Sequence, residues 1–88
     1  MTVSIEYHPR FKKQYKKLPS SVQARFQQRI KLLIIGPDNP TLRVHALKAE
    51  YKGYLSMNVT GDILALFYYE GTNVVVFGFI GTHSQLYG

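Results

Sequence analysis

Residues 63–80 read ILALFYYEGTNVVVFGFI, two apolar runs separated by the polar sequence EGTN. Each run has the length of a buried strand, about 4–8 residues, and neither approaches the roughly 18 apolar residues that a membrane span needs. Glycine and asparagine between the runs are typical of a tight turn. The stretch therefore predicts two paired strands, residues 63–69 and 74–80, at the centre of a sheet.

Three shorter strands are expected around this pair. Apolar and polar residues alternate over residues 53–60 and over residues 2–7, the period-two pattern of a strand with one buried face. The sequence Thr60-Gly61-Asp62 predicts a tight turn into the central pair. After a Gly- and Pro-containing loop, residues 43–48 predict a further short strand.

Residues 8–35 carry the periodicity of two helices. Pro9 suits the first turn of the first helix, whose apolar stripe is Phe11, Tyr15 and Leu18. Ser20 followed by Gln23 matches a capping box, which predicts Ser20 as the N-cap of the second helix. The apolar stripe of that helix is Val22, Phe26, Ile30 and Leu33. Gly36-Pro37 is expected to end it.

The predicted order of elements indicates an α+β fold. An N-terminal strand and a helical hairpin are expected to pack on a mostly antiparallel sheet of four to five strands, followed by a short polar tail at residues 81–88. With 88 residues, 45% of them hydrophobic, the chain is expected to form a single domain, residues 1–88. The sequence lacks cysteine and a signal-peptide pattern, so we expect a cytoplasmic protein without disulfides.

The charge is unevenly distributed along the chain. Eleven Lys and Arg residues against five Asp and Glu residues give a formal net charge of +6. Nine of the cations lie in the first half of the chain: Arg10, Lys12, Lys13, Lys16, Lys17, Arg25, Arg29, Lys31 and Arg43. Such a field attracts polyanions such as RNA or DNA. The alternative is that these cations only keep a small protein soluble.

The inventory of reactive side chains is short. The histidines at positions 8, 45 and 83 show no metal-binding spacing, and no phosphate-binding glycine motif occurs. His83 follows the last predicted strand and could transfer protons near neutral pH, or be an inert residue of the tail. From position alone, His45 is expected to make a structural hydrogen bond, and Asp62 is expected to form a turn. Tyr87 could stack on a base or simply pack.

Three segments together resemble one protein family, the RelE/ParE superfamily of bacterial and archaeal type II toxins, near its RelE/YafQ branch. These segments are VHALK at 44–48 followed by YKGYLS at 51–56, NVTGDILALFY at 58–68, and IGTHSQLY at 80–87. The last is similar to the family ending I-G-T-H-x-x-L/V-Y/F and is the most specific of the three. The resemblance covers nearly the whole chain.

The resemblance implies an activity and a partner. Members of the family are typically ribonucleases that cut mRNA in the ribosomal A site without a metal or other cofactor. In that reaction the ribose 2′-OH attacks the adjacent phosphate and the 5′-OH leaves. A small antitoxin, acidic where it meets the cationic surface, would be the protein partner. No membrane association is implied.

The same resemblance implies roles for individual residues. His83 is the leading acid or base, His45 a second acid or base or a phosphate contact, and Asp62 a supporting or basic carboxylate. Tyr87 would stack on the scissile nucleotide. The nearest cations that could contact the substrate phosphates in this chain are Lys48, Lys52 and Arg43. Contacts with ribosomal RNA are expected from Lys12, Lys13, Lys16 and Lys17.

The chain departs from the family pattern at three positions. Relatives often carry a cation or His at the position of Asn58, Arg at that of Leu64, and Asp or Arg at that of Phe79, whereas here all three are uncharged. Two alternatives to a nuclease follow from the fold: a catalytically weak or inactive domain that binds nucleic acid or antitoxin, and a ParE-like gyrase inhibitor. RNA scission by the unaltered protein would eliminate the first alternative, and normal DNA supercoiling in its presence would rule out the second.

Overall fold

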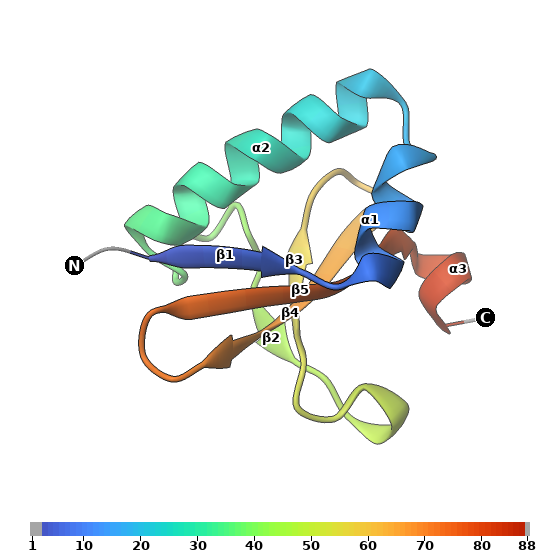
Figure 1. Cartoon of the computed structure of the whole chain (residues 1–88). Coiled ribbons are helices and arrows are strands. Elements are labelled where there is room, and N and C mark those ends of the chain that lie inside the picture. Colours follow the sequence, from blue (N-terminus) through green and yellow to red (C-terminus); the bar gives the residue numbers. More distant parts are fainter. Residues whose placement is uncertain (1–2, 88) are drawn as a thin grey trace.

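The computed structural model describes residues 3–87 and forms one five-stranded sheet with two helices on one face (Figure 1). The elements in chain order are β1 (Ser4–Tyr7), α1 (Pro9–Lys16), α2 (Ser20–Ile35), β2 (His45–Ala46), a 3₁₀ turn η1 (Ala49–Tyr51), β3 (Leu55–Asn58), β4 (Ile63–Glu70), β5 (Val74–Thr82) and α3 (His83–Tyr87). The helical hairpin and the central strands agree with the sequence-based prediction, and so does the α+β class.

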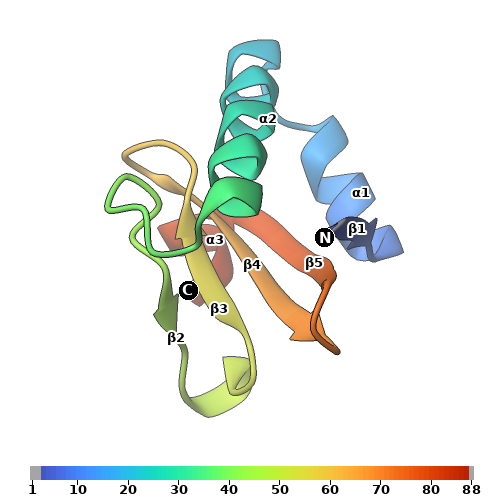
Figure 2. The same ribbon diagram turned by 90° about the vertical axis from the view of Figure 1, so that its left-hand side faces the viewer.

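The strand order in the sheet is β1-β5-β4-β3-β2. Neighbouring strands β2, β3, β4 and β5 are antiparallel, whereas β1 pairs with β5 in parallel, with Tyr7 opposite Phe77. The first and last strands of the chain therefore lie side by side. Helices α1 and α2 cover one face of the sheet, and the opposite face, called the open face below, has no long helix over it (Figure 2).

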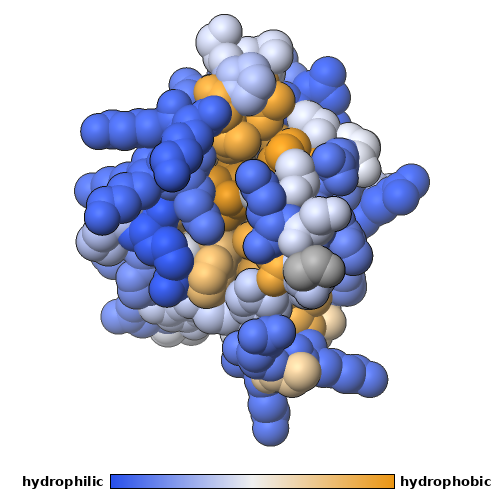
Figure 3. Space-filling view, turned by 90° about the vertical axis from the view of Figure 1, so that its right-hand side faces the viewer, coloured by the Kyte–Doolittle hydropathy of each residue, from blue (hydrophilic) through white to orange (hydrophobic). Residues whose placement is uncertain are grey.

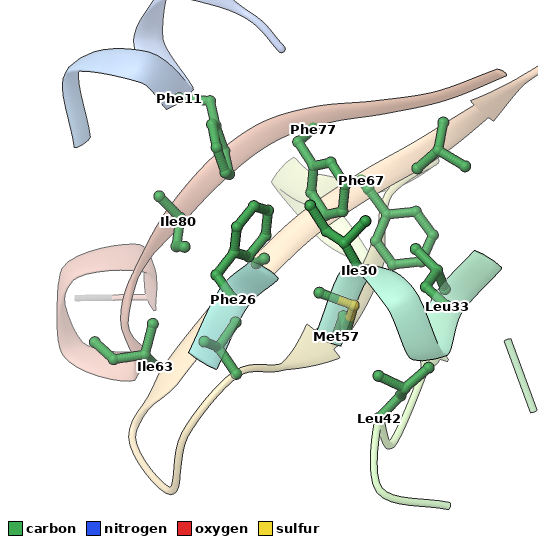
Figure 4. Packing of buried hydrophobic residues seen from close by; sticks show 13 residues of the cluster. Phe11, Phe26, Ile30, Leu33, Leu42, Met57, Ile63, Phe67, Phe77 and Ile80 are labelled. Carbon is green, nitrogen blue, oxygen red and sulfur yellow. The ribbon is translucent and has the colours of Figure 1, made fainter. Parts of the chain in front are cut away.

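Aromatic rings form the centre of the core between the helices and the sheet (Figure 4). Phe11 of α1, Phe26 of α2, and Phe67 and Phe77 of the sheet are each at most 2% exposed. The Phe26 and Phe77 ring centres are 5.1 Å apart with an edge-to-face angle of 77°. Burying such a side chain contributes about 1.5–3 kcal/mol, so these four rings hold the helical hairpin on the sheet.

Helix α1 also covers the edge of β5. Strand β1 ends at Tyr7, which leaves the second half of β5 without a neighbouring strand on that side. Two side chains of α1 take its place: Arg10 Nε donates a hydrogen bond to the Gly78 carbonyl (3.0 Å), and Gln14 Oε1 accepts one from the Ile80 backbone N–H (2.9 Å). This edge is therefore closed to pairing with another chain.

A β-bulge changes which residues of β5 face the core. Leu66 pairs with Phe79 while Phe67 pairs with Phe77, so Gly78 is the extra residue. Phe77 faces the core, but Phe79 joins Leu66 on the open face. A side chain at Gly78 would lie 2.6 Å from the hydroxyl oxygen of Tyr54, so this position accommodates only glycine without movement of that ring.

The predicted start of the second helix is wrong in its capping detail. Ser20 is the first helical residue, the N-cap is Pro19, and no side chain caps this end. The Gln23 amide instead donates to the carbonyls of Tyr15 (3.0 Å) and Leu18 (3.2 Å). These acceptors lie at the end of α1, so Gln23 ties the two helices together rather than closing a box within one.

The strand and tail boundaries also differ from the prediction. The strand expected over residues 53–60 is limited to Leu55–Asn58, and the one over 43–48 to His45–Ala46, because η1 and the left-handed Gly53 (φ 96°) lie between them. The expected polar tail is the helix α3. None of the helices within residues 3–87 combines the length and apolar character needed to cross a membrane.

Candidate active site

The open face of the sheet carries a row of paired residues from four strands. His45 lies opposite Ser56, Ser56 opposite Leu66, and Leu66 opposite Phe79. Directly paired residues project to the same face of a sheet, so His45 and Phe79 lie on the open face at the two ends of this row. The Ser56 hydroxyl in the middle is buried and has no hydrogen-bond partner within the described residues.

A solvent-open cavity of about 460 Å³ lies beside this row and is lined by His45, Leu47, Leu64, His83 and Tyr87. His45 and Leu47 come from the β2 edge, Leu64 from β4, and the other two from α3. The cavity thus brings together three of the residues that the sequence singled out, His45, His83 and Tyr87, from segments almost 40 positions apart.

A capping box fixes the start of α3 and with it the position of His83. The Thr82 hydroxyl accepts a hydrogen bond from the Gln85 backbone N–H (3.1 Å), and the Gln85 side-chain oxygen accepts one from the Thr82 N–H (2.8 Å). Buried Leu86 anchors the helix to the core. His83 is therefore held, exposed, as the first residue of α3.

Tyr87 lies one helical turn after His83, and their ring centres are 4.7 Å apart at an angle of 48°. The ring of Tyr51 packs edge-on against Tyr87 at 5.6 Å, and the Tyr51 hydroxyl donates a hydrogen bond to the Leu86 carbonyl. Burial, and then the neighbouring Tyr51, raise the pKa of Tyr87. Tyr87 is 37% exposed, which leaves part of its ring for a ligand.

His45 is oriented by a backbone group. Its Nδ1 lies 3.0 Å from the Arg43 carbonyl oxygen, and since a carbonyl only accepts, Nδ1–H is the donor. In the neutral ring Nε2 then carries the lone pair and is available as a base. Arg43 has a left-handed backbone (φ 49°), which turns the chain so that this carbonyl reaches the ring.

Asp62 lies next to His83 through its backbone. The His83 N–H donates to the Asp62 carbonyl (3.2 Å), and the Thr60 hydroxyl accepts from the backbone N–H groups of Asp62 (3.3 Å) and Ile63 (3.1 Å). The residue is exposed and is not among those lining the cavity. The structure therefore places the Asp62 backbone beside His83, whereas the exposed Asp62 side chain is outside the lining of the cavity.

The predicted cationic contacts fall into two groups. Lys48, Lys52 and Arg43 are exposed near the β2 edge, outside the lining of the cavity. The lysines of α1 and the residue after it are also exposed: Lys12, Lys13, Lys16 and Lys17. Two of them, Lys12 and Lys16, border a different groove, of about 300 Å³, between α1 and α2. Figure 3 shows the end of the molecule that carries α1 and α3, where hydrophilic side chains project on both sides of a hydrophobic strip.

The three uncharged positions lie on the open face. Leu64 lines the cavity, and it is paired with Asn58 on β3 and Gly81 on β5. Phe79 lies further along β5, in edge-to-face contact with Tyr51 (5.1 Å). Within residues 3–87 no group of three or more His, Cys, Asp or Glu side chains is arranged to hold a metal ion.

One residue at this face, Arg10, is not predicted by any sequence motif. The guanidinium carbon of Arg10 lies 3.8 Å from the centre of the Phe79 ring. In the sequence Arg10 is one of nine cations that make the first half of the chain positive. The β-bulge and the bond from Arg10 to β5 bring it to the open face, and both are tertiary features without a local sequence signal.

Comparisons with known proteins agree on the class that this fold and face define, small RelE-like toxins. The crystal structure of YafQ from E. coli strain BL21(DE3) matches with a TM-score of 0.82 and 24% identity, covering 99% of this chain and all of that chain. The E. coli DinJ–YafQ toxin–antitoxin complex matches with a TM-score of 0.80 and 23% identity, over 100% of both chains. A YoeB/ParE toxin from Agrobacterium tumefaciens matches with a TM-score of 0.78 at 13% identity, over 92% of this chain and 99% of its own.

The family model described as "Bacterial toxin of type II toxin-antitoxin system, YafQ" matches residues 3–88. The chain belongs to this family and is the toxin of a type II toxin–antitoxin pair. The resemblance seen in the sequence motifs is thereby confirmed. A search of curated proteins found no significant match to the chain.

Proposed function

We propose that residues 1–88 act as a single toxin domain that cleaves mRNA on the ribosome. The observation that supports this most directly is the convergence of His45 and His83 on one open cavity, with the partly exposed ring of Tyr87 beside them. Two imidazoles at one cavity can supply an acid and a base near neutral pH. Membership in the YafQ toxin family is consistent with a ribonuclease.

The proposed reaction is an internal transesterification of RNA. The ribose 2′-oxygen attacks the adjacent phosphorus, the O2′–P bond forms, and the P–O5′ bond breaks. The 2′-OH gives its proton to a base, and an acid protonates the leaving 5′-oxygen. The products are a 2′,3′-cyclic phosphate and a 5′-OH end, and the proposal assigns no metal or cofactor to the step.

The hydrogen bond of His45 suggests how the two imidazoles divide these roles. With Nδ1–H bonded to the Arg43 carbonyl, neutral His45 presents Nε2 as the base for the 2′-OH. Protonated His83 is then the acid for the 5′-oxygen. The exposed Asp62 carboxylate belongs to the residue whose backbone binds His83, and it would support the positive charge of His83 rather than remove the proton itself.

The remaining predicted residues would bind the RNA. Tyr87 offers a ring on which a base next to the scissile bond can stack. Lys48, Lys52 and Arg43 would contact phosphates near the β2 edge. The lysines of the first helix, Lys12, Lys13, Lys16 and Lys17, would contact ribosomal RNA by charge, which makes ribosome binding strongly dependent on salt.

We also propose a cognate antitoxin as the protein partner, since a relative of the same fold is found in the DinJ–YafQ toxin–antitoxin complex. Charge complementarity favours an acidic segment in that partner, because the toxin carries a net charge of +6. An activity on translating ribosomes belongs in the cytoplasm, where both partners would meet the toxin.

The test is cleavage of an mRNA during translation in a purified system, with the chemistry of the new ends determined. We expect 2′,3′-cyclic phosphate and 5′-OH ends, and a loss of about 10²–10⁴ in rate for His83→Gln and for His45→Gln. Ser84→Ala, an exposed neighbour outside the cavity lining, is the control and should cleave like the unaltered toxin. Full activity of both histidine variants would contradict the assigned mechanism.

The uncharged positions Asn58, Leu64 and Phe79 support a second candidate, a domain that binds antitoxin or RNA without cutting. A stable complex with translating ribosomes, combined with intact mRNA at every toxin concentration, would favour that function. Any scission that depends on His83 would eliminate it.

A further inference from the structure

Arg10 carries positive charge from the helical side of the molecule to the open face. The residue belongs to α1, but its guanidinium carbon lies 3.8 Å from the centre of the Phe79 ring. Phe79 is paired with Leu66 in the row that contains His45. The cation is therefore on the same face of the sheet as the candidate active site.

The guanidinium group is held in place and still has free donors. Its Nε–H donates to the Gly78 carbonyl at 3.0 Å, and its central carbon lies over the Phe79 ring. The two terminal amino groups have no hydrogen-bond partner within residues 3–87. A guanidinium fixed on an aromatic ring loses little further entropy when it binds, and its fork of donors matches a phosphate.

A continuous set of aromatic rings links Arg10 to the cavity. The Phe79 ring contacts Tyr51 at 5.1 Å between centres, and Tyr51 contacts Tyr87 at 5.6 Å. Tyr87 in turn lies 4.7 Å from the His83 ring. An RNA strand with its scissile nucleotide at His83 would follow these rings toward Arg10, along a surface of the kind that binds single strands.

The charge of Arg10 also lies near a part of the open face where the strands carry no cationic side chain. Leu64 in the cavity wall and Phe79 on β5 are both apolar, so neither strand position can hold a phosphate. We propose that Arg10 binds a backbone phosphate of the RNA away from the scissile one, at the far end of this series of rings, and that it supplies from α1 the cation missing from the strands. This inference rests on the proposed function, since its ligand is the RNA bound for cleavage.

The test compares Arg10→Gln with Arg25→Gln in the translation-coupled cleavage assay. Both variants lose one positive charge, and Arg25 is an exposed residue of α2 outside the cavity lining. A Gln side chain at position 10 can still donate to the Gly78 carbonyl, and equal thermal midpoints of both variants would show intact folding. We expect kcat/KM to fall by about tenfold or more for Arg10→Gln and to stay unchanged for Arg25→Gln.

The salt dependence separates a phosphate contact from a structural role. If Arg10 binds one phosphate, Arg10→Gln reduces the slope of log affinity against log salt by about 0.7 for single-stranded RNA, measured on the uncleaved RNA complex of the His83→Gln background. Arg10→Lys, which keeps the charge without the fork, should retain most of the slope and part of the rate.

Three outcomes would overturn the inference. If the unaltered toxin cleaves and Arg10→Gln cleaves equally well with the same salt slope, Arg10 only covers the edge of β5. If Arg10→Gln weakens antitoxin binding while cleavage is unchanged, the ligand is the protein partner and not RNA. If the unaltered toxin cuts no mRNA, the proposed function itself fails, which the first two outcomes do not imply.

Discussion

The backbone N–H of His83 donates a hydrogen bond to the backbone carbonyl of Asp62, 3.2 Å away. This bond joins the turn before β4 to the start of α3. The position of His83, the candidate acid, therefore depends on the backbone carbonyl of Asp62 and not on its side chain. The carboxylate itself is exposed, outside the lining of the cavity. The two parts of this residue can therefore be tested separately.

Asp62→Asn should reduce cleavage by about tenfold or less, against about 10²–10⁴ for loss of an acid or base. The substitution keeps the backbone carbonyl that holds His83 and removes only the charge of the exposed side chain. The cleavage rates of Asp62→Asn and His83→Gln are measured in parallel, so that the two losses can be compared directly. A loss as large as that of His83→Gln would show that the carboxylate acts directly on the substrate.

Thr82→Val should destabilise α3 and lower cleavage together. The variant keeps the shape of the side chain but removes the hydroxyl that accepts from Gln85 N–H, a cap worth about 0.5–2 kcal/mol. Loosening α3 misplaces His83 and Tyr87, so activity should fall although neither residue is changed. Chemical denaturation and cleavage rates measure the two effects, and Ser84→Ala is the control. Unchanged stability would contradict a role for the capping box.

Gly78→Ala should destabilise the protein by about 1–3 kcal/mol, because the added methyl would meet the Tyr54 ring. Gly61→Ala is the matched control, since nothing lies within 4 Å of a side chain there. Unfolding in denaturant gives both values. The same loss for both variants would mean that the effect does not come from the contact with Tyr54, since the effect of Gly→Ala on the unfolded chain is stabilising.

Ser56→Ala should leave the free energy of unfolding unchanged or raise it by about 1 kcal/mol. The Ser56 hydroxyl is buried without a partner in the described part of the protein, so its removal relieves a desolvation penalty. Denaturant unfolding of Ser56→Ala beside the exposed control Ser84→Ala checks this. A marked loss of stability would reveal a bond of the hydroxyl, for example to a buried water.

Stability should fall when the pH rises above about 10, the ordinary range of a tyrosine pKa. Burial raises the pKa of Tyr7, Tyr69 and Tyr87, with further contributions from Tyr15 to Tyr7 and from Tyr51 to Tyr87. Above that pH the unfolded chain has lost these protons while the folded chain still holds them, so the free energy of unfolding decreases with pH.

Denaturant unfolding at pH 9 and at pH 11 measures this decrease, and Tyr87→Phe should lessen it. A free energy of unfolding that stays constant over this range would contradict the raised pKa values. Stability below pH 9 is not expected to respond to these groups, because all three phenols are protonated in both states there.

The central strands and the helical hairpin could be predicted because their signals are local. The apolar runs at residues 63–69 and 74–80 and the stripes of the helices each report burial directly. The parallel pairing of β1 with β5 has no such signal, since it joins the two ends of the chain. Family motifs, rather than periodicity, were needed to bring His45 and His83 together.

Two of the errors, at the start of α2 and in the expected tail, came from one sequence pattern with two outcomes. Ser20–Gln23 and Thr82–Gln85 both match a capping box, but only the second forms one. At the first, the carbonyls at the end of α1 compete for the Gln23 amide. At the second, a five-residue helix was hidden in a polar segment, because its single buried residue, Leu86, gives no periodicity.

Strand β2 holds His45 with two residues at the outer margin of the sheet, whereas His83 follows directly from β5 in the interior. The two imidazoles are thus attached to parts of the molecule that differ in local stability, and the β2 edge should unfold locally at a lower temperature than β5. Warming should therefore displace His45, one member of the proposed acid–base pair, while the hydrophobic core stays intact. Heat inactivation should then occur at a lower temperature than the unfolding transition measured by circular dichroism. A partner that displaces the β2 edge would likewise inhibit the toxin without unfolding it.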